Sequence, residues 1–137
     1  MRQQGERGSI AIELAFLAPV VLLILALIWG YGRVAWANGH LEAGTRDAAR
    51  VATQARSLQE AQAAAERAVR DATAAVPACQ STARVTLTGR FQPGETITVD
   101  ATCRYPLGDI GLPGAPGTMN PTSSFSSVLD RHRGVED

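Results

Sequence analysis

The sequence predicts an α+β protein: a long transmembrane helix that continues as an amphipathic helix, a second helix, and a small antiparallel sheet of two or three strands. Three observations support this class. Residues 14–32 carry no formal charge, residues 41–76 repeat apolar side chains at intervals of three and four, and residues 83–103 alternate apolar and polar side chains. The 137-residue chain has room for one membrane span and one small domain.

The membrane helix is predicted at residues 9–32, which include Leu14, Pro19 and Trp29. At about 1.5 Å per residue, the uncharged part covers roughly 28 Å, close to the hydrocarbon thickness of a bilayer. A kink is expected at Pro19, because proline lacks a backbone N–H and its ring clashes with the preceding turn. The sequence therefore predicts a single span.

Glu13 is an isolated carboxylate at the start of this span. A carboxylate costs up to about 2.5–3.5 kcal/mol at mid-membrane and less near an end. We therefore expect another group to compensate its charge. The alternative is an unpaired carboxylate that reaches the lipid headgroups.

The residues around Glu13 resemble a known processing site. Gly8, with Ser9 after it and Glu13 five positions on, resembles the site in type IV pilin-like precursors. The run RGSIAIELAFLAPVVLLIL is most similar to the TadE-like minor pseudopilins of tight-adherence (Tad) pili. The resemblance is strong over residues 7–33, moderate over 44–53 and loose afterwards. Leu14 departs from the pattern, since Tad pilin sites usually have an aromatic residue there.

The resemblance implies a structural function in building a Tad-type pilus or secretion filament. A prepilin peptidase would remove residues 1–8 as a leader, and the new ammonium at Ser9 would meet Glu13 of a neighbouring subunit. The implied partners are the cytoplasmic membrane, the prepilin peptidase, other pilus subunits and assembly-platform proteins. The implied location is the cell membrane, single-pass, with the N-terminus cytoplasmic and the C-terminal domain outside.

Two other interpretations of the N-terminus stay open. An uncleaved signal anchor would present a small binding module, keep Met1 and be indifferent to Glu13→Ala. A conventional signal peptidase could cut before Asn38, because Ala35-Trp36-Ala37 fits its small-x-small rule, and would release a soluble domain. Against cleavage at Asn38, the uncharged run is longer than the 7–15 residues typical of a signal-peptide core.

Residues 33–76 are predicted to form a helical stalk and a second helix. Ser57 and Glu60 have the spacing of a capping box, so the helix should break near Gln54–Ser57 and restart at Leu58. Pro77 should end the second helix. The alternative is one unbroken helix to Val76. The apolar stripes consist of Leu41, Ala48, Val51, Ala52, Ala55 and Leu58, followed by Ala61, Ala65, Val69, Ala72 and Val76.

Residues 77–137 are predicted to form a small β domain. Strands at 83–88 and 96–103 flank a Pro-Gly turn at 92–95, and residues 106–121 form a Pro/Gly loop. Residues 123–131 are the candidate for a third strand, with Phe125 and Leu129 as its candidate inward residues.

Cys79 and Cys103 bracket the two predicted strands. In an extracytoplasmic domain they should pair, which would stabilise the fold by ~3.5 kcal/mol in the chain-entropy model. The alternative is two unpaired, partly buried thiols.

The sequence offers no catalytic residues, so we expect no enzyme. His40 and His132 lack carboxylates at ligand spacing, and the glycine-rich segment 108–117 lacks the Lys-Ser/Thr of a phosphate loop. All 13 basic residues are arginine and are balanced by 13 acidic residues. We therefore expect no metal, cofactor, small-molecule substrate or nucleic-acid partner.

Overall fold

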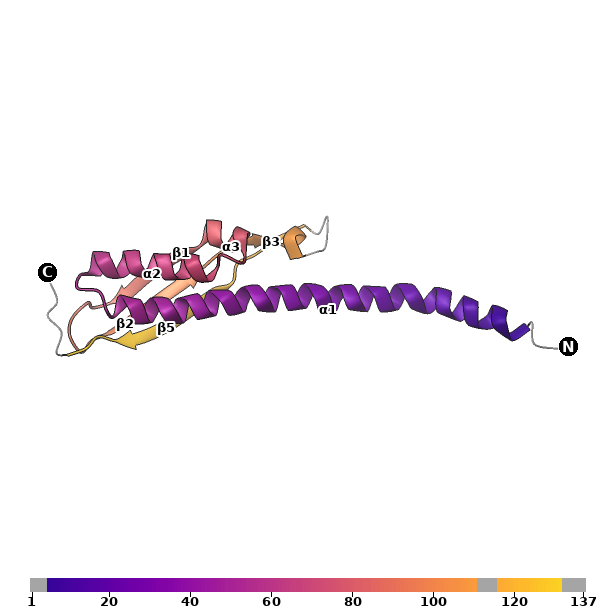
Figure 1. Ribbon diagram of the computed structural model, residues 1–137, viewed down its shortest axis with the longest axis horizontal. Coiled ribbons are helices and arrows are strands. Elements are labelled where there is room, and N and C mark those ends of the chain that lie inside the picture. Colours follow the sequence, from indigo (N-terminus) through magenta and orange to yellow (C-terminus); the bar gives the residue numbers. More distant parts are fainter. Residues whose placement is uncertain (1–4, 111–115, 132–137) are drawn as a thin grey trace.

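The computed structural model describes residues 5–110 and 116–131, and it confirms the α+β class. One long helix projects far beyond the rest of the molecule, and the other elements pack along its C-terminal part (Figure 1). The helices are α1 (Gly5–Ala52), α2 (Leu58–Ala72), α3 (Pro77–Thr82) and the 3-10 helix η1 (Leu107–Ile110). The strands are β1 (Arg84–Gly89), β2 (Thr96–Thr102), β3 (Tyr105–Pro106), β4 (Thr118–Met119) and β5 (Thr122–Val128).

α1 is continuous for 48 residues and contains Pro19. Figure 1 shows the helix curving gently along its length, without a sharp bend. The membrane segment and the first part of the stalk are therefore one rod.

The predicted break between α1 and α2 is confirmed, so the alternative of an unbroken helix is wrong. Ser57 is the N-cap of α2, and its hydroxyl accepts a hydrogen bond from the amide of Glu60 at 3.2 Å. The Glu60 carboxylate accepts from the amide of Arg56 at 2.9 Å, one residue before the N-cap. The cap thus satisfies two amides at the start of α2, as a capping box does, with the second bond displaced by one residue.

The prediction that Pro77 ends the second helix is wrong. α2 ends at Ala72, and the hydroxyl of the following Thr73 donates to the carbonyl of Val69 at 2.8 Å. Pro77 instead begins α3, because at the first position of a helix the missing N–H is not needed.

The main sheet has three antiparallel strands in the order β1-β2-β5, which confirms the third strand. The β1–β2 connection contains the predicted turn, in which the amide of Glu95 donates to the carbonyl of Gln92 at 3.0 Å. Gly94 has a φ of +83°, a conformation that glycine adopts without steric cost.

Part of the predicted Pro/Gly loop is ordered structure. Tyr105 pairs with Met119 and Pro106 with Thr118, so β3 and β4 form a second sheet of two strands, with η1 following β3. Residues 111–115 lie outside the described part of the chain. Two-residue strands are too short to show alternation, so no sequence pattern predicts them.

The core lies between one face of the sheet and the pair α1–α2 (Figure 1). Its helical side chains are mostly alanine, which allows the elements to approach closely. Leu58 is part of the predicted apolar stripe, but its side chain is 54% exposed. It is the first residue of α2 and faces solvent. The buried core consists of Leu41, Ala48, Ala49, Ala52, Ala55, Ala61, Ala65, Val69, Cys79, Ile97, Val99, Ala101, Cys103 and Leu129.

The two predicted inward residues of the last strand differ in burial. Leu129 follows β5 and is buried. Phe125 pairs with Val99, which puts it on the inner face, but β5 is an edge strand and the ring stays 38% exposed. The Arg46 guanidinium lies 5.3 Å from its centroid and covers part of it.

Cys79 of α3 and Cys103, just after β2, form a disulfide with their Cα atoms 5.0 Å apart. Both residues are buried. The bond fastens the short α3 to the central strand, so the segment that leaves α2 is held against the sheet.

Candidate functional site: the exposed shaft of α1

The candidate site is the N-terminal part of α1, which projects beyond the domain (Figure 1). Its large apolar side chains are exposed: Leu14 by 65% and Trp29 by 64%. Within the described residues, one helix is long and apolar enough to cross a membrane, with a mean hydropathy of 2.8 and none of that window buried. Such a surface is stable only when lipid or other apolar helices cover it. Among the described residues, this one candidate span fits a single-pass membrane protein.

The predicted processing residues lie within this helix. Gly8 and Ser9 are in the first turns of α1, and Glu13 follows one turn after Ser9. Cleavage after Gly8 and pairing between neighbouring subunits stay predictions.

Glu13 is solvent-exposed and has no cationic partner among the described side chains. The ion pair found there is Arg46–Glu42 at 3.1 Å, on the stalk, where both groups are hydrated. A carboxylate inside the hydrocarbon core of a membrane has no comparable hydration. A cation that compensates Glu13 would therefore come from outside the described part of this chain, and an unpaired Glu13 would have to reach the lipid headgroups.

The described residues contain no group of three His, Cys, Asp or Glu side chains that could hold a metal ion. The two cysteines are joined in the disulfide. His40 is half-buried, and its Nδ1–H donates to the carbonyl of Ala72 at 3.0 Å, while His132 lies outside the described residues. His40 thus joins α1 to the end of α2, a role that we did not predict because nothing local in the sequence signals a bond across 32 positions.

Gly44 is a second position that sequence reasoning missed. A Cβ atom there would lie 2.8 Å from the Cβ of Ala72 and 3.2 Å from the Cα of Val69. A glycine inside a helical pattern is the available signal for such a close approach.

Residues 8–50 match the model of a protein family described as "TadE-like protein". The matched segment begins at Gly8 and includes Glu13, the apolar shaft and the Gly44 contact. No curated protein and no solved structure matches the chain significantly. Residues 8–50 of this chain are therefore similar to TadE-like proteins, and this similar segment contains the exposed apolar helix, as in a membrane-anchored protein related to Tad pili.

Proposed function

We propose that the protein is a minor pseudopilin that contributes to a Tad-type pilus or secretion filament. In this proposal α1 anchors it in the cytoplasmic membrane, the domain lies outside, and a prepilin peptidase removes residues 1–8. The observation that supports it best is the exposed apolar shaft with a single unpartnered carboxylate at Glu13, inside the segment that matches the family.

Cleavage after Gly8 would supply the missing partner. It would create an ammonium at Ser9, and an opposite charge about 4 Å from Glu13 is worth about 4 kcal/mol at an effective dielectric constant of 20. Glycine has a low helix propensity, which makes local opening for a peptidase less costly at Gly8 than at most residues.

The charged pair would also set the axial register of neighbouring subunits. Apolar side chains surround the shaft, and such a surface allows two helices to slide past each other at little cost. A single polar contact in an apolar interface favours one register. Glu13 would thus select the position at which one subunit meets the next.

The disulfide is consistent with a domain on the outer side of the membrane. Stable disulfides form in oxidising compartments and are rare in the cytosol. The domain would then be available to other pilus subunits and to assembly-platform proteins, while Gly8 stays on the peptidase side of the membrane.

The processing step is tested by the intact mass of the mature chain, expressed with and without a Tad prepilin peptidase. We expect a start at Ser9 only when the peptidase is present. Gly8→Leu should keep Met1, whereas Gly5→Leu in the same leader should be cut as in the wild type. An intact Met1 under all conditions would establish an uncleaved anchor, and a start at Asn38 would indicate a secreted domain.

The role of Glu13 is tested by recovery of the protein in sheared filaments. Glu13→Gln should reduce recovery by at least about tenfold, because loss of one partner leaves the other charge unpaired in a low-dielectric contact. Glu42→Gln, which removes a carboxylate from the hydrated stalk, is the matched control and should assemble normally. Equal recovery of both variants would show that Glu13 does not control assembly.

A further inference from the structure

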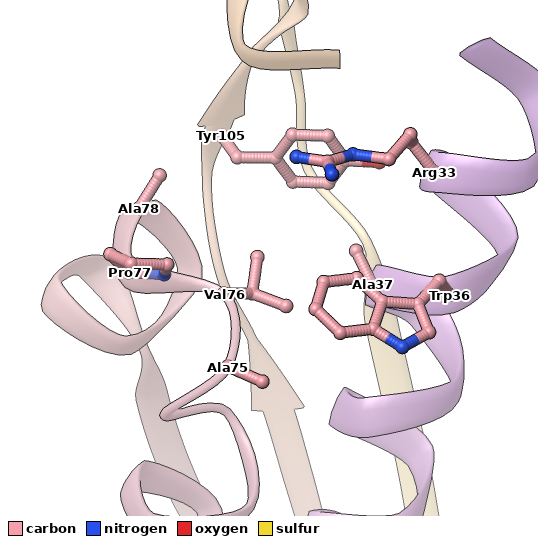
Figure 2. Close-up of a pocket in the computed structure, with 8 residues that line it drawn as sticks. All are labelled: Arg33, Trp36, Ala37, Ala75, Val76, Pro77, Ala78 and Tyr105. Atoms are coloured by element: carbon pink, nitrogen blue, oxygen red, sulfur yellow. The ribbon is translucent and has the colours of Figure 1, made fainter. Parts of the chain in front are cut away.

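A pocket of about 320 Å³ lies where the domain meets α1, just beyond the apolar shaft. Figure 2 shows Trp36 and Ala37 extending from α1 toward Val76 in the segment Ala75–Ala78, while Arg33 extends from α1 toward Tyr105 of β3. The pocket therefore exists only where the domain is docked on the helix.

The pocket lies next to the end of the apolar run of α1. Arg33 directly follows the uncharged run that ends at residue 32, and the helix has Trp29 before it and Trp36 after it. Tryptophan and tyrosine favour the headgroup level, and arginine at the end of a span extends to the same depth. In a bilayer that α1 crosses, the pocket would lie at the headgroups of the leaflet on the domain side.

The pocket contains one cation and no carboxylate. Its lining includes Arg33 and no acidic side chain. Within the described part of the chain, no carboxylate is within ion-pair distance of the Arg33 guanidinium. The guanidinium lies 5.9 Å from the centroid of the Trp36 ring. The Trp36 ring is itself fixed edge-to-face against His40, with centroids 4.7 Å apart. The guanidinium is held beside the pocket with its anion-binding capacity unused.

Tyr105 adds a hydrogen-bond donor on the other side. It is buried, and burial raises the pKa of its phenol, so the hydroxyl keeps its proton. The hydroxyl contacts Met119 Sδ at 3.9 Å, and a thioether is a weak acceptor. A better acceptor entering the pocket would find the hydroxyl available.

We propose that this pocket binds the phosphodiester headgroup of a phospholipid from the domain-side leaflet. Arg33 pairs with the phosphate, Tyr105 donates to an oxygen of the headgroup, and Val76 and Pro77 contact its apolar part. Because α1 supplies one wall and the domain the other, the bound lipid fastens the domain to the helix and sets its height above the bilayer. The inference requires only membrane insertion and applies to the chain with or without its leader.

The test uses the full chain in detergent, titrated with 1-palmitoyl-2-oleoyl phosphatidylglycerol and observed by native mass spectrometry. We expect one lipid to bind in preference to the diacylglycerol with the same acyl chains, which lacks the phosphate. Arg33→Gln should weaken this binding by about fivefold, the contribution expected of one cation near an anionic lipid. Arg50→Gln, an exposed arginine on the same helix and away from the pocket, should leave it unchanged.

A second variant tests the pocket itself. Ala75 lies on its exposed rim, so Ala75→Trp should fill the space and reduce binding while Arg33 is intact. Circular dichroism and the oxidised state of the disulfide would verify that both variants fold.

Four outcomes would overturn the proposal. Diacylglycerol could bind as well as the phospholipid, or both pocket variants could bind like the wild type. Inorganic phosphate at equal concentration could displace the lipid, which would indicate a general anion site. Arg33→Gln could change the oligomer mass and not lipid retention, which would assign Arg33 to a protein contact.

Discussion

Tyr105 is the residue whose titration links burial to stability. Burial raises the pKa of its phenol above the ordinary value of 10.0, so the folded state resists deprotonation more than the unfolded chain does. The contribution to stability is complete below pH 10 and is lost as the pH rises through the folded pKa.

We therefore expect the free energy of unfolding to fall as the pH increases from 9 to 12, and to fall less in Tyr105→Phe, which cannot ionise there. Thermal melts of the full chain in detergent across this range would measure the difference between the two proteins. Parallel curves would show that Tyr105 ionises with equal ease in the folded and unfolded states.

At the scale of elements, the seam between α1 and α2 depends on the absence of a side chain at Gly44. A Cβ atom would lie 2.8 Å from that of Ala72, closer than real Cβ contacts allow, and the backbone of Val69 is 3.2 Å away. Gly39, on the same helix, has no atom within 4 Å of the equivalent position. Alanine substitutions at these two glycines therefore distinguish the effect of helix propensity from the effect of packing.

Gly39→Ala should raise the free energy of unfolding by about 0.5–1 kcal/mol through helix propensity. Gly44→Ala should lower it by about 1–3 kcal/mol despite the same gain, because the helices must move apart. Thermal or chemical unfolding of both variants in detergent would measure these changes. A stabilised Gly44→Ala variant would mean that α2 can shift at negligible cost.

At the scale of the whole molecule, the disulfide reports which side of the membrane holds the domain. Cys79 and Cys103 are buried and joined, so neither presents a thiol. If the domain is extracytoplasmic, thiol alkylation of the denatured protein from cells should label it only after reduction. Labelling without reduction would place the domain in a reducing compartment.

Removal of both sulfurs by Cys79→Ala with Cys103→Ala should cost about 2–4 kcal/mol of unfolding free energy. The effect should match that of reducing the wild type, because each releases α3 from β2. Melting temperatures of the three samples provide the comparison. An unchanged melt in both cases would mean that packing alone holds α3 in place.

Several parts of the fold could be predicted because their signals are local. The apolar run marks the span, Ser57 and Glu60 mark the start of α2, and alternation marks β1 and β2 with Ile97, Val99 and Ala101 inward. Other parts could not, because non-local contacts decide them. The role of Pro77 depends on α2 already having ended at Ala72, and β3 pairs with β4 across the Pro/Gly segment.

The sequence by itself determined that this chain has one apolar span, a carboxylate at its start, and a TadE-like segment from Gly8 to Arg50. These properties depend on the order of residues along one helix. Only the tertiary structure decided that Gly44 is a contact between helices and that His40 joins α1 to α2. It also decided that one pocket is lined by Arg33, Trp36 and Tyr105. Each of these contacts joins α1 to a residue far along the chain, and they form because an alanine-rich core lets α2 and the sheet pack closely against α1.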